Sequence, residues 1–288
     1  MNMAEPVYIQ PFVVNHEIAH QLGYGKENEA NFVGVFVGIE SPDPETLRLA
    51  SKKQNTRRSI PDSIHRIYGA GMFVTAGFIV GFDSEKGAIA DAMAQLIEDA
   101  AIPVAMVGLL YALPNTQLTR RLEHEGRLHP LPEFLPKEDM CTQGLNFETK
   151  RPRREILQDY RDVLEKIYDP VAYAGRVKRL TGLLNNASRA RQIKGSVSGR
   201  TTGNIELMQR LLAGMPEPKR IFREAVSNCA ATNPKSVRYI LGQLAFYMHL
   251  GPFSRYVMGR LDEMIAELDE APRPHVIIHA NEQPALMN

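Results

Sequence analysis

Three short apolar runs, separated by two helical patterns, dominate the first half of the chain. The runs are VGVFVGI (33–39), FVTAGFIVGF (73–82) and VAMVGLLYAL (104–113), and each leads into a Gly, a carboxylate or a Pro turn. Continuous runs of this kind, rich in β-branched residues, are typical of strands buried on both faces of a parallel sheet. Their alternation with helices predicts parallel strands joined by right-handed crossovers.

The helical patterns between the runs are amphipathic. The first spans 59–71 and ends at two glycines, and the second spans 88–100. Their apolar faces carry Ile60, Ile64 and Ile67 in the first pattern, and Ile89, Met93, Leu96 and Ile97 in the second. Three strand–helix units are too few for a closed eight-stranded barrel. We therefore predict an α/β fold in which parallel strands form half of a smaller, open barrel.

The second half of the chain, from Pro152 to about Leu268, is helical in pattern. Helices are expected at 154–170, 171–184, 204–215, 218–231, 234–250 and 254–268. The segment before them, 127–150, is rich in Pro and charge and has the composition of a linker. We predict four parts: an N-terminal segment (1–31), a partial barrel (32–150), an all-α domain (151–270) and a disordered tail (271–288).

The composition excludes several classes of protein. The 288 residues include 34 Lys and Arg against 33 Asp and Glu, so the chain has no basic footprint for nucleic acid. No apolar run reaches the roughly 18 residues of a transmembrane helix. The N-terminus carries Glu5 and no basic segment, which is unlike a signal peptide. We expect a cytoplasmic protein.

The chain contains only two cysteines, Cys141 and Cys229, and no CxxC pair. It is therefore not a disulfide scaffold, and it cannot supply three cysteines to an iron–sulfur cluster. We interpret Cys141 as a loop thiol and Cys229 as a small core residue.

The second run contains the motif Gly77-x-Ile79-x-Gly81, followed by Asp83. Glycines near the end of a parallel strand let the backbone approach a flat ligand, because glycine has no Cβ. Main-chain groups there are able to bind the edge of an adenine ring. The alternative is a plain turn after the strand.

Polar residues follow the other two runs. Glu40, at the end of the first, is placed to accept a hydrogen bond from a ribose hydroxyl or an ammonium group. Ser41 and Asp43 are expected to cap the next helix. After the third run, the turn ALPNT contains Asn115, which tolerates left-handed backbone geometry. A plain turn that caps the following helix explains Asn115 and Thr116 equally well.

These motifs resemble the second half of a radical S-adenosylmethionine (SAM) barrel of the cobalamin-associated kind. In that family a Gly-x-Ile-x-Gly strand lines the adenine of SAM, a GIES strand faces the cofactor, and an LPGT turn ends the last barrel strand. Here Asn115 stands in place of the turn glycine. The resemblance implies a SAM site formed by Glu40, Gly77, Ile79, Gly81 and Leu110.

The helical part, with REILQDYRDVLEKIYDPVAY (154–173), is similar to the domain that follows the barrel in B12-binding radical SAM proteins, including hopanoid C-2 methylases. The resemblance implies reductive SAM cleavage by a [4Fe–4S] cluster and cobalamin-dependent methyl transfer to a lipid-like or small-molecule substrate. The CxxxCxxC cluster loop, the first barrel strands and the cobalamin domain have no counterpart in this sequence. We therefore predict that this polypeptide is inactive alone and self-associates through open barrel edges.

The N-terminal segment carries a different motif, HEIAH (16–20), which is the HExxH pattern of zinc peptidases. His16 and His20 would lie on one helical face as zinc ligands, with Glu17 as general base and Glu29 as the best third ligand, ahead of Glu27. This predicts a zinc metallopeptidase as the alternative function. A surface helix that binds no metal is the plainer interpretation. A helical interaction module without enzymatic activity is a third possibility for the whole chain.

The two resemblances meet at EANF (29–32), a tetrapeptide that occurs in relatives of both kinds. We interpret this point as a junction between two unrelated segments, produced by recombination or by a join in sequence assembly.

Overall fold

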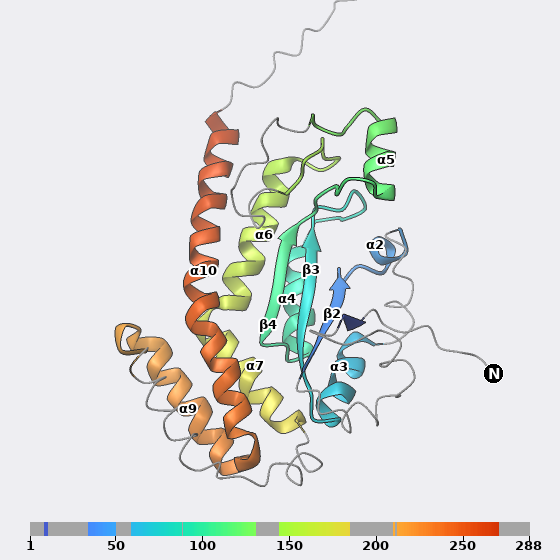
Figure 1. Cartoon of the computed structure of the whole chain (residues 1–288). Coiled ribbons are helices and arrows are strands. Elements are labelled where there is room, and N and C mark those ends of the chain that lie inside the picture. The colour runs from blue at the N-terminus through green and yellow to red at the C-terminus, as the bar shows by residue number, and fades with distance from the viewer. Residues whose placement is uncertain are drawn as a thin grey trace, which may run out of the picture.

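A computed structural model of the chain describes residues 9–10, 34–49, 59–87, 89–130, 144–184, 210 and 212–270. Its strands form one sheet in the order β1 (Ile9–Gln10), β2 (Gly34–Glu40), β3 (Phe73–Val80) and β4 (Val104–Leu109) (Figure 1). Strands β2, β3 and β4 are parallel, and β1 is antiparallel to β2. The predicted α/β fold with parallel strands, followed by a helical part, is confirmed.

Helices α2 (Pro44–Leu49), α3 (Ile60–Gly69), α4 (Ile89–Asp99) and α5 (Gln117–His124) follow the strands. Local capping explains where they begin. The Asp43 carboxylate accepts the Thr46 amide at 2.9 Å, and the Thr116 hydroxyl accepts the Thr119 amide at 3.2 Å. The capping role predicted for Asp43 is confirmed, and Thr116 caps its helix as the plain-turn alternative requires.

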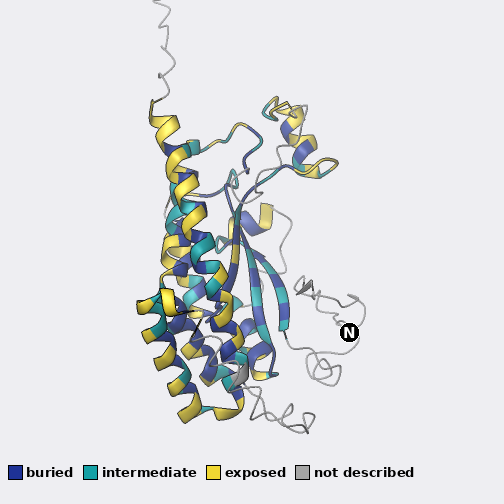
Figure 2. Cartoon of the chain, turned by 60° about the vertical axis from the view of Figure 1, so that its left-hand side comes forward, coloured by how far each residue is buried: buried dark blue, intermediate teal, exposed yellow. Residues whose placement is uncertain are grey.

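The two faces of the sheet differ in burial. One face is completely packed, and it consists of Val35, Val37, Ile39, Val74, Ala76, Phe78, Val80, Ala105, Val107 and Leu109. It shares a core with apolar residues of α3, α4 and α6, and α4 lies behind β3 and β4 in Figure 1. Apart from the buried Val104, residues on the other face are only partly buried or exposed, and the teal and dark-blue segments alternate along the strands in Figure 2. The prediction that both faces are buried is therefore wrong for these strands.

The second half is all-helical, as predicted. It contains α6 (Arg153–Tyr168), α7 (Pro170–Leu183), the 3-10 turns η3 (Leu212–Gly214) and η4 (Pro234–Ser236), α9 (Pro216–Thr232) and α10 (Val237–Glu270). Two helices were expected where α10 runs unbroken through Pro252. Tertiary packing explains this, because α10 lies along both α6 and α9 and buries one side of its length. The expected helix 204–215 falls largely outside the described residues.

Helix α6 closes the outer edge of β4. The Tyr160 hydroxyl donates to the Val107 carbonyl at 3.0 Å, and the Tyr168 hydroxyl donates to the Ala105 carbonyl at 2.7 Å. These carbonyls lie two residues apart, so they point to the same side of the strand. The edge of β4 is thus covered rather than open, which corrects the prediction of exposed barrel edges at this strand. Self-association itself stays a prediction.

The predicted linker (127–150) is described at 127–130 and 144–150, and part of the second stretch is tightly packed. Leu145 and Phe147 are each only 1% exposed. The Asn146 side chain donates to the Ala112 carbonyl at 3.1 Å and accepts the Ala112 amide at 2.8 Å. This segment therefore anchors the helical part to the end of β4.

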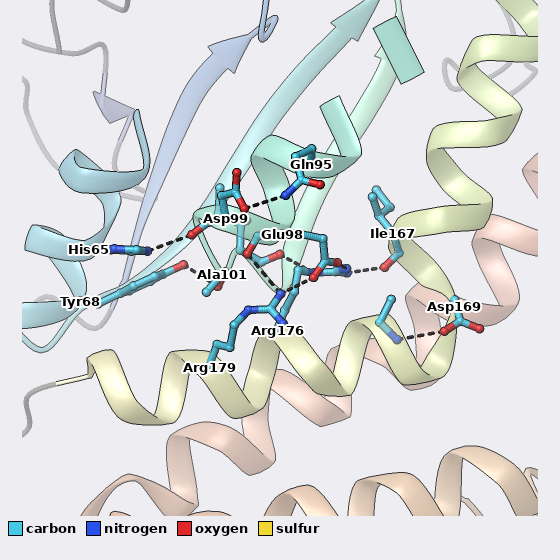
Figure 3. Close-up of polar contacts among 12 residues, drawn as sticks. His65, Tyr68, Gln95, Glu98, Asp99, Ala101, Ile167, Asp169, Arg176 and Arg179 are labelled. Carbon is cyan, nitrogen blue, oxygen red and sulfur yellow. Dashed lines mark hydrogen bonds and ion pairs between the residues drawn. The ribbon is translucent and has the colours of Figure 1, made fainter. Parts of the chain in front are cut away.

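The amino end of β4 is fastened by a fully buried arginine, Arg176 of α7 (Figure 3). Its guanidinium donates to the Ile102 carbonyl at 2.9 Å, and also to the Ile167 carbonyl and the Glu98 carboxylate. The Tyr68 hydroxyl donates to the Ala101 carbonyl at 3.0 Å beside it. A buried charge with this many hydrogen-bond partners has a structural role, because it holds these segments together.

None of the described helices has the length and hydrophobicity that a membrane span requires.

Candidate functional site

The partly exposed side of the sheet, which we call the open face, consists of Gly34, Phe36, Gly38, Glu40, Phe73, Thr75, Gly77, Ile79, Met106 and Gly108, together with the buried Val104. Four of these eleven positions are glycines. Parallel sheets usually carry branched side chains on both faces. Gly38 pairs with Gly77, and Gly77 pairs with Met106, so one row across the sheet has side chains almost only at its β4 end.

The glycines of the open face differ in the room around them. A Cβ on Gly77 would lie 2.9 Å from Cζ of Phe36, because this ring lies over the glycine. A Cβ on Gly108 would meet nothing within 4 Å. Met106, on the same strand, is 57% exposed. The β4 side of the open face therefore offers an apolar surface with space above the backbone.

Glu40 lies at the carboxyl end of the open face in an unusual conformation. Its φ is 71°, a region that residues with a Cβ rarely adopt. A Cβ on Gly38 would lie 2.7 Å from the Glu40 carboxylate oxygen Oε1, so the side chain folds back along this face. Backbone strain of this kind is often found at binding sites. Asn115 also has a positive φ, 65°, as predicted for the turn after β4.

Gly81 and Leu110 lie in packed surroundings at the ends of β3 and β4. Gly81 has a φ of 110°, and a Cβ there would lie 2.7 Å from the Leu145 side chain. Leu110 donates its amide to the Val80 carbonyl at 2.8 Å, and its carbonyl accepts the Leu145 amide at 2.7 Å. Of the five predicted SAM residues, the structure thus brings Glu40, Gly77 and Ile79 to the open face, while Gly81 and Leu110 support it from behind.

A buried acidic residue that the sequence interpretation missed, Glu85, lies in the turn after β3. Its carboxylate accepts the Gly81 amide at 2.9 Å. Burial raises the pKa of the Glu85 carboxyl group to about 7, although backbone hydrogen bonds and Arg151 act in the opposite direction. A carboxylic acid four residues after the glycine motif was the only signal in the sequence.

Asp83, noted in the sequence as an acidic residue after the motif, is engaged by arginines. It accepts hydrogen bonds from Arg127 at 2.6 and 2.9 Å and from Arg121 at 3.0 Å. Burial acts to raise the pKa of Asp83, but the Arg127 hydrogen bonds and the charges of both arginines outweigh it, so the pKa is lowered. Asp83 therefore ties the β3 turn to α5 and to the segment after it.

The predicted zinc ligands His16, His20 and Glu29, with Glu17, lie outside the described residues, and so does Cys141. Within the part of the chain that the structure describes, no three His, Cys, Asp or Glu side chains are grouped to hold a metal ion. Cys229 is a buried free cysteine in α9, as predicted. The zinc site stays a prediction.

The helical part of the chain matches a known protein family. A family model described as a domain of unknown function, DUF4070, matches residues 116–263, more than half of the chain. The chain belongs to the DUF4070 family. A model of a second family, described as a protein of unknown function, DUF3810, matches residues 1–50. The predicted domain boundaries stay predictions.

Two curated proteins are similar to this DUF4070 chain. The uncharacterized methyltransferase sll1242 of Synechocystis is 40% identical over 171 residues, which is 58% of this chain and 31% of that protein. The hopanoid C-2 methylase of Rhodopseudomonas palustris is 32% identical over 148 residues, which is 51% of this chain and 26% of that protein. The chain thus spans less than a third of either relative's length. No solved structure matches.

These matches confirm the resemblance to the C-terminal part of a radical SAM methylase. The strand motifs that suggested it lie on the sheet, whereas the helical stretch 154–173 lies within the DUF4070 match, which begins at Thr116, after β4. The sheet and the helical part share one apolar core, so the two lines of similarity concern one packed unit.

Proposed function

We propose that the open face of the sheet binds SAM, as one half of a site for radical SAM methyl transfer. The observation that carries this proposal is the difference between the two faces of one parallel sheet. One face is packed with branched side chains, while the other is glycine-rich and partly exposed. The names of the two relatives support methyl transfer as the reaction class.

Within this proposal, Gly108 lets a flat adenine ring approach the backbone beside the Phe36 ring that lies over Gly77, and Ile79 and Met106 supply apolar contacts. Glu40 accepts hydrogen bonds from a ribose hydroxyl or from the ammonium group of the ligand. When bound, SAM supplies an activated methyl group and the bond that the family cleaves reductively. The residues of this chain bind and orient it.

The chain does not fit the iron–sulfur cluster of the family. It contains two cysteines, and Cys229 is buried in a helix of the second half, so three cysteine ligands are not available. We derive no step through the cluster or through cobalamin. We propose that residues outside these 288 would have to supply both groups, and that this polypeptide alone does not turn over.

Isothermal titration calorimetry with SAM tests the binding proposal. The Gly108→Val variant places two methyl groups on the open face, where a Cβ meets no neighbour, and valine is favoured in strands. We expect it to weaken SAM binding at least about tenfold, since the ligand loses its close approach to the backbone.

The matched control is Gly259→Val on the exposed side of α10, where a Cβ also has open space. This variant is expected to bind SAM like the parent chain. Absence of SAM binding by the parent chain, or equal affinity in both variants, would contradict the proposal.

A further inference from the structure

The outer side of α10 carries a row of aromatic side chains that the proposed SAM site does not use. Phe246 is 50% exposed and Tyr256 is 57% exposed. His249 and Phe253 lie between them, and their ring centroids are 5.6 Å apart, while those of Phe253 and Tyr256 are 6.4 Å apart. Because these four residues recur at intervals of three or four, they lie on one side of the helix. We call them the aromatic stripe.

The aromatic stripe faces away from the core of the protein. The positions of α10 that pack into the core, such as Leu244, Tyr247 and Val257, lie on the opposite side of the helix. Helix α6 lies between α10 and the sheet in Figure 1, and exposed positions, drawn in yellow, recur along α10 in Figure 2. The aromatic stripe is therefore a surface separate from the open face of the sheet.

The stretch of chain that carries the aromatic stripe is strongly basic, although the whole chain has a net charge of only +1. Residues 216–260 contain seven Lys and Arg against two Glu, and no acidic residue occurs from 225 to 261. A stretch with this excess of positive charge attracts an anionic partner.

Basic side chains lie close to the aromatic stripe. Arg255 is exposed next to Tyr256, and the exposed Arg260 follows Tyr256 by four residues, which places it on the same side of α10. Lys235, in the turn that precedes α10, is exposed and forms no ion pair with a described residue. The exposed rings and the positive charges thus belong to one part of the surface.

The last part of α10 has the opposite charge. Residues 261–270 contain five Asp and Glu and no Lys or Arg. Three of these acidic residues, Asp262, Glu263 and Asp269, bind arginines of the same chain. The acidic end is therefore largely neutralised from within, whereas most of the positive charge of 216–260 is not.

Charge complementarity indicates what kind of partner fits this surface. Aromatic rings and basic residues on one side of a helix suit the interface of an anionic bilayer, where rings enter the headgroup region and cations attract the lipid. A second copy of this chain fits less well, because two such surfaces would bring like charges together. Single-stranded nucleic acid needs free ring faces, whereas these rings stack on one another.

We propose that the aromatic stripe and the basic residues around it dock the chain onto the surface of a bilayer that contains anionic lipid. The rings enter the headgroup region, and the Lys and Arg side chains contact lipid phosphates. This inference goes beyond the proposed binding of SAM and does not depend on it, since it concerns a different surface of the protein.

Co-sedimentation of the full chain with lipid vesicles tests the proposal. Vesicles of phosphatidylcholine are compared with vesicles in which about 30% of the lipid is phosphatidylglycerol. We expect at least about tenfold tighter binding to the anionic vesicles at low salt, and a smaller difference at about 0.5 M salt. Equal binding to both kinds of vesicle, or binding to neither, would overturn the proposal.

Two double variants separate the rings from the charges. Phe246→Gln with Tyr256→Gln removes exposed rings only, and it should weaken binding to anionic vesicles at least about tenfold. Lys235→Gln with Arg260→Gln removes two positive charges and should weaken this binding at least about fivefold. Unchanged binding in either double variant would overturn the proposal, because docking requires both the rings and the charges.

The matched control is Leu268→Gln, which replaces another exposed apolar residue of α10, 40% exposed, within the acidic end. It should bind vesicles like the parent chain, and all these variants should unfold in urea like the parent chain, because the replaced side chains are exposed. Equally weakened binding in Leu268→Gln would contradict a specific role for the aromatic stripe.

Sedimentation velocity without lipid tests the competing occupant. We expect the parent chain and the Phe246→Gln, Tyr256→Gln double variant to have the same oligomeric state. A dimer of the parent chain that this double variant abolishes would show that the aromatic stripe is a contact between two copies, and would overturn the proposal.

Discussion

The two faces of the sheet are built from the same three parallel strands, yet they differ in burial. On the packed face, all of the strand residues, such as Val35 on β2 and Leu109 on β4, are buried against helices. On the open face, glycines alternate with Phe36, Ile79 and other residues that keep part of their surface exposed. Because side chains alternate between faces, one strand can stabilise the fold with one set of residues and present a binding surface with the other. The predictions below test this division.

The largest expected difference concerns two phenylalanines on neighbouring strands, Phe78 on the packed face and Phe36 on the open face. Phe78→Ala leaves a cavity in the core and should lower the free energy of unfolding by about 3–5 kcal/mol. Phe36→Ala should lower it by less than half as much, because its ring is only partly buried. Urea denaturation of both variants measures this, and equal losses would show that the two faces are packed alike.

Next in size is the effect of pH through Glu85. Its pKa is raised from 4.5 to about 7 in the folded chain, so the folded state holds the proton more tightly than the unfolded state. Stability contributed by this group is therefore greatest below pH 4.5 and falls as the pH rises toward 7. The loss is on the order of 2–3 kcal/mol.

Glu85→Gln should remove this pH dependence, while Glu155→Gln should keep it. Thermal or urea unfolding between pH 5 and pH 8 provides the comparison. A parent chain that becomes more stable over this range, relative to Glu85→Gln, would contradict the assigned direction of the pKa shift.

The edge of β4 gives a smaller effect. Tyr168→Phe leaves the buried Ala105 carbonyl without its hydroxyl donor and should cost about 1–3 kcal/mol. Tyr256→Phe, on the exposed side of α10, serves as the control and should change little. If sedimentation shows that Tyr168→Phe also self-associates, the hydroxyl protects this strand edge. Unchanged stability would mean that the hydrogen bond is not important for sealing the edge.

The smallest expected effects distinguish two glycines. Gly81→Ala has to adopt a positive φ and press against Leu145, so it should cost about 1–2 kcal/mol. Gly108→Ala should stay within about 0.5 kcal/mol, because a Cβ there has open space. Similar losses in the two variants would argue against a free surface above Gly108.

Much of the fold was predictable from local patterns. The strands, the caps at Asp43 and Thr116 and the left-handed Asn115 depend on residues close in sequence, and the structure confirms them. The burial of Leu145 could not be predicted in this way, because it depends on a strand end far away in the sequence. The continuous α10 was also missed, since its packing against α6 and α9 outweighs the tendency of Pro252 to end a helix.

The candidate site was predicted in part. The glycine motif and Glu40 could be found because their residue types and strand-end positions are themselves informative. Glu85 was missed because its burial, rather than its position in a motif, makes it unusual. Gly108 was missed because the absence of neighbours around a glycine is a property of the folded sheet.

The central claim is that the open face binds SAM, and photochemical cross-linking of SAM to the chain tests it most directly. Peptide mass spectrometry then locates the label. We predict labelled peptides from 34–40, 73–80 and 104–109, with less labelling in Gly108→Val and unchanged labelling in Gly259→Val. Labelling confined to the helical part, or no specific labelling, would contradict this account.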